Sequence, residues 1–192
     1  MNKDRLTAFT DGVVAIIITI MVLDLKVPQG AGLADLLPIL PVFLSYALSF
    51  VYVAIYWNNH HHMLQTVDRV NGAILWANMN LLFWLSLVPF TTAWLGHNHF
   101  AHVPNGVYGL SLIMPATAYF VLQKAIVRQQ GAGGLLAKAL GRDIKGKVSL
   151  VLYAAAIGVS FFAPMVSLAL YVAVAMIWLV PDRRIEQTLP IS

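Results

Sequence analysis

The sequence predicts an all-α membrane protein with six transmembrane helices, and three observations lead to this fold class. Hydrophobic residues make up 59% of the 192 residues and charged residues only 10%, whereas a soluble domain carries about 25% charged residues. Several uncharged stretches reach the roughly 20 apolar residues that a membrane-spanning helix needs. The basic residues gather in the segments that alternate spans would place on one side. We therefore expect a single six-helix transmembrane domain over residues 1–192.

The first four spans are expected at residues 5–25, 36–62, 70–96 and 104–127. In the first of them, Asp11 and Asp24 leave only twelve uncharged residues, 12–23, between them. A helix of that length measures about 18 Å, which is less than the roughly 30 Å hydrocarbon core. Three explanations are open: the acids lie inside the membrane, they lie at the headgroups of a thinned bilayer, or the helix is shielded by protein or water.

The last two spans are expected at residues 146–161 and 165–181. Residues 148–180 contain no charge and one proline, Pro164. As one helix this stretch would be about 50 Å long, far more than a bilayer core requires, so we expect a turn near "SFFAP", residues 160–164. The glycine-rich and basic segment before it, residues 128–147, is expected to be a flexible linker.

The distribution of basic residues predicts the orientation. With six spans, Lys26 alone falls on one side and the other eleven of the twelve lysines and arginines fall on the opposite side. Because basic loops remain cytoplasmic, we expect both termini and residues 128–147 to face the cytoplasm, with the chain in the cell inner membrane. The first span is not expected to be a cleaved signal, since acidic residues bracket its apolar run. The absence of cysteine excludes disulfides and thiolate chemistry.

The first span carries a stripe of four residues on one helical face. Ile16, Thr19, Ile20 and Leu23 follow the spacing i, i+3, i+4, i+7, which places them on one side of a helix. This stripe has two interpretations. It is ordinary helix packing, with the Thr19 hydroxyl bonded to its own backbone, or it lines a narrow pore around which several copies form rings. Spacing alone leaves both open.

A short motif precedes this stripe. "RLTAFTD", with Arg5, Phe9, Thr10 and Asp11, resembles the R-x-x-x-F-S-D signature of the transmembrane-protein-175 potassium channels in their bacterial form. Thr10 replaces the serine of the signature and keeps its hydroxyl. The apolar residues that follow, the "YWNNHHH" end of the second span and "LVPFTTAWLG" in the third are also similar to that family, so the resemblance covers most of the chain.

The resemblance implies a potassium-selective channel that conducts passively and is not an enzyme. It implies a homotetramer with one six-helix unit per subunit, in which the first helices line a central pore that lacks a carbonyl filter. Carried over by position, Ile16 would form the constriction, Thr19 a neighbouring threonine ring, and Ile20 and Leu23 further rings. The partners are then the lipid bilayer, other copies and permeant potassium ions. No cofactor, metal or nucleic acid is expected.

The motif needs partners inside the subunit. We expect Arg5 and Asp11 to form a buried pair near the cytoplasmic end of the first helix, since ionisable residues in spans usually face the protein interior. The candidate partners for the motif are His60, His61, Asn71 and Asn78. A metal site at residues 60–62 is not expected, because adjacent helical residues point about 100° apart.

A different class of function remains open from the residues alone. A secondary transporter or proton-coupled carrier would favour inverted repeats and helices broken near the midplane. We find no repeat, and Pro89 and Pro115 are the only candidates for breaks in the middle of the chain. An enzyme is the weakest alternative, because the sequence offers neither a nucleophile–base pair nor an acid-rich metal motif.

Overall fold

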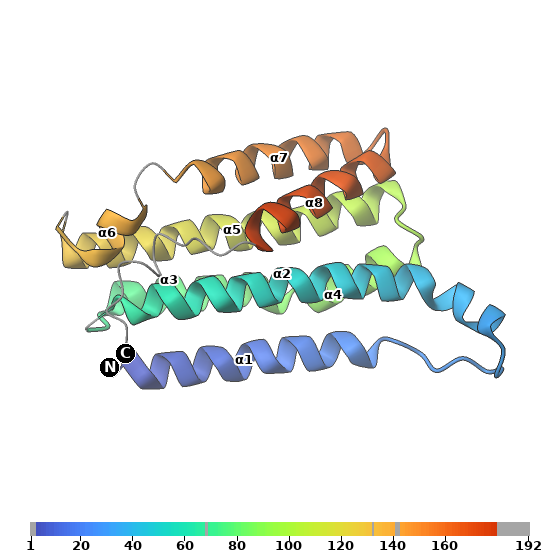
Figure 1. Cartoon of the computed structure of the whole chain (residues 1–192), viewed down its shortest axis with the longest axis horizontal. Helices are drawn as coiled ribbons and strands as arrows, with labels where there is room; N and C mark the ends of the chain where they lie inside the picture. Colours follow the sequence, from blue (N-terminus) through green and yellow to red (C-terminus); the bar gives the residue numbers. More distant parts are fainter. Residues whose placement is uncertain (1–2, 68, 132, 141–142, 180–192) are drawn as a thin grey trace.

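A computed structural model describes residues 3–67, 69–131, 133–140 and 143–179, without the side chains of residues 138–140. These residues form a bundle of helices that run along a common direction (Figure 1). The helices in chain order are α1 (Lys3–Leu23), the 3-10 helix η1 (Leu33–Ile39), α2 (Leu40–Gln65), α3 (Gly72–Ser86), α4 (Val88–His97), α5 (His102–Gln130), α6 (Leu135–Leu140), α7 (Ile144–Ser160) and α8 (Pro164–Leu179).

Four helical stretches are long and apolar enough to cross a membrane: residues 3–23, 33–65, 72–97 and 102–130. The third consists of two helices, because Pro89 in the first turn of α4 has no backbone N–H to continue the ladder of α3. Pro115, in contrast, lies inside a continuous α5. The uncharged stretch 148–180 is divided between α7 and α8, and Pro164 begins the second of these helices, a position that suits proline.

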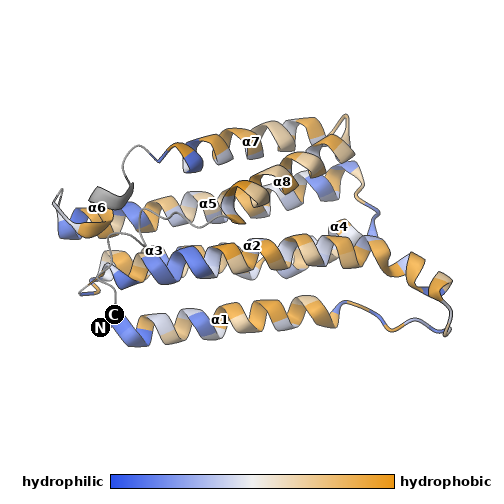
Figure 2. Ribbon diagram, viewed as in Figure 1, coloured by the Kyte–Doolittle hydropathy of each residue, from blue (hydrophilic) through white to orange (hydrophobic). Residues whose placement is uncertain are grey.

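The two ends of the bundle differ in charge. The start of α1, the end of α2, the starts of α3 and α7, the end of α5 and all of α6 lie at the same end (Figure 1), which we call the basic end. Hydrophilic residues gather there on α1 and α2, while the middle of the bundle is apolar (Figure 2). The basic residues at or near this end, with described side chains, are Lys3, Arg5, Arg69, Lys124, Arg128, Lys145 and Lys147.

The core has two parts. One joins α1, α2, α3 and α5 and includes Leu6, Ile17 and Ile74. The other joins α2, α4, α5, α7 and α8 and is rich in tyrosine, including Tyr108 and Tyr171. Because α1 contributes only to the first part and lies at one edge of the bundle (Figure 1), one of its faces has no neighbour among the residues that the structure describes.

Candidate functional site

One face of α1 is buried and the opposite face is open. The buried side chains are Leu6, Thr10, Val14, Ile17 and Met21, which recur every three to four residues and pack against α2, α3 and α4. This periodicity is that of one helical face. It fixes the rotation of α1, and so decides which residues point away from the bundle.

The four stripe residues predicted from the sequence all lie on the open face. Ile16 is 59% exposed, Ile20 51% and Leu23 77%, and Thr19 is exposed as well. Within one subunit, therefore, the stripe is not a packing surface. A contiguous apolar surface of this kind faces lipid, another copy of the chain or a pore.

Thr19 places an oxygen on this apolar face. Its Oγ1 donates to the backbone carbonyl of Ala15 at 2.8 Å. Because the hydroxyl proton is used in that bond, the lone pairs of the oxygen are left to interact outward. Gly12, one turn before Ile16 and two turns before Thr19, adds no side chain to the same face. The face thus combines branched apolar groups with a single acceptor.

The motif hydroxyl, Thr10, points the other way and joins three helices. Its Oγ1 accepts from Asn78 Nδ2 of α3 at 3.0 Å, and Asn78 Oδ1 lies 2.7 Å from His60 Nε2 of α2. The three residues are each at least 97% buried. Polar side chains in membranes commonly join helices in this way, so this chain of bonds holds α1 to α2 and α3.

Asp11 has a partner that sequence reasoning missed. Its Oδ1 accepts from Trp57 Nε1 at 2.8 Å, and the Trp57 ring stacks on His61 with 6.0 Å between ring centroids. Trp57 stands three residues before His60, so the two share a side of α2. The signal available in the sequence was chemical: the Trp57 indole can only donate a hydrogen bond, and the ionised Asp11 carboxylate can only accept one.

Arg5 and Asp11 are not brought together. They are six residues apart in α1, so their side chains point about 120° apart around the axis. Arg5 is exposed, and no ion pair joins it to Asp11 in the part of the chain that the structure describes. Phe9 is 52% exposed on the open face. Asn71 lies elsewhere and caps α3, accepting from Ile74 N at 2.9 Å.

A second contact holds the far end of α1. Asp24, just beyond the helix, accepts from His97 Nε2 at the end of α4, with 3.3 Å between Nε2 and Oδ1. His97 thus helps to position α1. Both ends of the helix are fixed to the subunit while the face with Ile16 and Thr19 stays open. Among the described residues, no group of three histidines or acids could hold a metal.

The Thr10–Asn78–His60 chain gives a testable prediction. Asn78→Leu should lower the free energy of unfolding by about 1–3 kcal/mol, because it removes two interhelical bonds and leaves buried polar atoms unpaired. Thermal unfolding of the purified protein in detergent measures the change. Asn80→Leu is the matched control, since Asn80 is exposed on the same helix. Equal melting temperatures for the two variants would contradict a structural role for Asn78.

Known proteins resemble this chain, one along nearly its whole length and others along part of it. A family model described as "Endosomal/lysosomal potassium channel TMEM175" matches residues 5–89. A potassium channel of Chryseobacterium sp. (strain P1-3) is 55% identical over 189 residues, 98% of both chains. A potassium channel of Streptomyces collinus is 37% identical over 131 residues, 64% of both chains.

A solved structure resembles the fold. It is the crystal structure of a lysosomal potassium-selective channel TMEM175 homolog from Chamaesiphon minutus, with a TM-score of 0.81 and 28% sequence identity. The match covers 94% of this chain and 97% of that one. The chain is thus a multi-pass membrane protein, its relatives are channels and not enzymes, and it belongs to the TMEM175 family.

Proposed function

We propose that this chain is the subunit of a potassium channel whose pore is lined by the open face of α1. The observation that carries the proposal is that Ile16, Thr19, Ile20 and Leu23 all point away from the subunit, while Thr10 and Asp24 fix the two ends of the helix. Two relatives that match most of the chain are named potassium channels, which supports the choice of ion.

We propose that several copies of the chain surround the pore. Four copies would form a homotetramer, with six spanning helices per subunit. Rings of Ile16, Ile20 and Leu23 would then constrict it. Hydrophobic constrictions control conduction by how readily they fill with water. Thr19 lies three residues from Ile16, and its outward lone pairs could replace part of the hydration that a cation loses there. A lipid-facing α1 would give this oxygen no role.

Flux measurements test the function directly. The purified protein is reconstituted in liposomes with a potassium gradient, and we expect potassium flux, single-channel current steps and a reversal potential nearer to that of potassium than of sodium. A secondary transporter would move ions without current steps. Flux without current steps would contradict the proposal, and so would a reversal potential that does not change with the potassium gradient.

The orientation is proposed to place the basic end at the cytoplasm, with both termini there, in the inner membrane. The chain has no cysteine, so single-cysteine variants can be labelled without removing others. Cysteine at Gly133, which is exposed and open to an added Cβ, should resist a membrane-impermeant maleimide in intact cells. Cysteine at Val27, which is 86% exposed, should react. The reverse labelling pattern would invert the orientation.

A further inference from the structure

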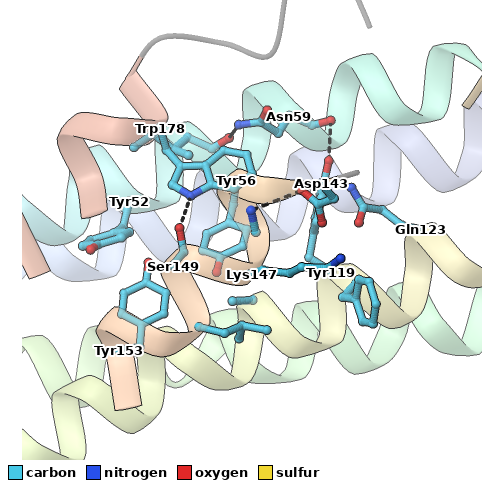
Figure 3. Close-up of a pocket in the computed structure, with 15 residues that line it drawn as sticks. Tyr52, Tyr56, Asn59, Tyr119, Gln123, Asp143, Lys147, Ser149, Tyr153 and Trp178 are labelled. Carbon is cyan, nitrogen blue, oxygen red and sulfur yellow. Dashed lines mark hydrogen bonds between the residues drawn. The ribbon is translucent and has the colours of Figure 1, made fainter. Parts of the chain in front are cut away.

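A cavity of about 90 Å³ lies between α2, α5, α7 and α8, away from the open face of α1. Its walls are mostly apolar and aromatic (Figure 3). A cavity of this size could hold several water molecules, but apolar cavities tend to stay dry or to take up apolar molecules. The aromatic residues around it are Tyr52, Tyr56, Tyr119, Phe120, Tyr153 and Trp178.

The lining changes in character along the bundle. Tyr52, Ala116 and Tyr153 lie near the middles of their helices, whereas Asn59, Gln123 and the first turn of α7 lie nearer the basic end. On α7, Tyr153 lies six residues after Lys147, a separation of about 9 Å along the axis. The cavity is therefore apolar toward the middle of the membrane and polar toward one surface, which is the order of groups in a lipid of that leaflet.

One polar group inside the cavity has no protein partner. Gln123 is only 6% exposed, and its side-chain amide makes no hydrogen bond to any other residue that the structure describes. Its neighbours are satisfied: Tyr119 donates to the Asn59 carbonyl at 3.0 Å, and Trp178 donates to Ser149 Oγ at 2.8 Å. Because Gln123 lines the cavity, its amide is free to hydrogen-bond to a ligand that carries a polar group at that depth.

The mouth of the cavity carries charge. Lys147 is exposed in the first turn of α7, and no ion pair engages its ammonium group among the residues described. Asp143 is used as the cap of the same helix and accepts from Gly146 N at 3.2 Å. Lysine side chains at the membrane surface attract anionic lipid groups, so Lys147 is available for a phosphate.

We propose that the cavity, which is partly open, binds a segment of one acyl chain of a phospholipid from the leaflet at the basic end. The chain fills the aromatic part, the amide of Gln123 donates to an ester carbonyl of the lipid, and the phosphate lies beside Lys147. A free fatty acid shares the chain chemistry but lacks the phosphate and the second chain, so it is the alternative source that the experiment must distinguish. The proposal does not depend on which ion the chain conducts.

Native mass spectrometry of the delipidated protein tests this site, with added phosphatidylglycerol, phosphatidylethanolamine or oleate as probes. We expect one tightly held phospholipid per chain. Ala116→Leu, which fills the cavity, should reduce this occupancy at least tenfold, while the control Ala155→Leu, on an exposed part of α7, should not. Lys147→Gln should weaken phosphatidylglycerol severalfold, and Lys26→Gln at the opposite end of the bundle should not.

A second variant keeps the test decisive if Ala116→Leu fails to fold. Gln123→Leu keeps the approximate size of the side chain and removes the amide, and it should lower phospholipid occupancy while leaving the lipid-free protein folded. Unchanged phospholipid occupancy in both Ala116→Leu and Gln123→Leu would overturn the site. Oleate binding as tightly as phosphatidylglycerol, with no effect of Lys147→Gln, would overturn the phospholipid as its occupant.

Discussion

Replacing Ile16 with asparagine is expected to raise the potassium current about ten- to a hundredfold and to admit sodium. In the proposed pore, an ion must lose water at the Ile16 ring, and an apolar wall gives nothing in exchange. A hydrogen bond to a charged group is worth about 1.5–3 kcal/mol, and each 1.36 kcal/mol off a barrier corresponds to about a tenfold faster rate. An amide also keeps water in the constriction, so hydrated sodium should pass.

Single-channel conductance and the reversal potential in mixed potassium and sodium measure this effect. Val22→Asn is the control, because Val22 is on α1 and 42% exposed but points about 120° away from Ile16. The structure gives Ile16 no packing role in the subunit, so assembly should be retained. A variant with the conductance and selectivity of the parent would mean that this face of α1 does not line the narrow part of a pore.

The stripe on α1 was predictable from the sequence because helical periodicity is a local property. Ile16, Thr19, Ile20 and Leu23 share a face in any α-helix, whatever surrounds it. Whether that face is packed or open depends on where Leu6, Val14 and Ile17 find neighbours, and those neighbours lie on α2, α3 and α4. The pattern therefore predicted which residues share a face, but it could not decide whether that face packs against other helices or lines a pore.

The contacts of the motif were predictable in kind but not in pairing. His60 and Asn78 were candidates, yet they reach Thr10 rather than Arg5 or Asp11, because the relative rotation of three helices decides which polar groups meet. Asn71 stands directly before α3, and asparagine there is a cap signal that the apolar run around it obscured. The lipid cavity has no sequence signature, since four helices contribute its walls.

Thr19→Val is expected to lower the preference for potassium over sodium about fivefold and to leave assembly intact. Valine keeps the shape of threonine but removes the oxygen. Among the described residues, the only bond lost is the one to the Ala15 carbonyl, which a helix tolerates. Potassium is larger than sodium, so its charge lies farther from water oxygens and its hydration is weaker by Coulomb's law. A ring of single hydroxyl oxygens should therefore replace a larger share of the lost hydration energy for potassium than for sodium. A difference of about 1 kcal/mol between the two ions corresponds to roughly a fivefold preference for potassium.

The chain provides a closely matched control for this change. Thr117 on α5 is exposed and its Oγ1 donates to the Ile113 carbonyl at 2.9 Å, the same local bond that Thr19 makes on α1. Thr117→Val should therefore leave the reversal potential unchanged, and Thr19→Ser, which restores the oxygen, should recover most of the preference for potassium. If Thr19→Val and Thr117→Val both keep the reversal potential of the parent, the Thr19 oxygen takes no part in choosing the ion, and the apolar rings alone must account for any selectivity.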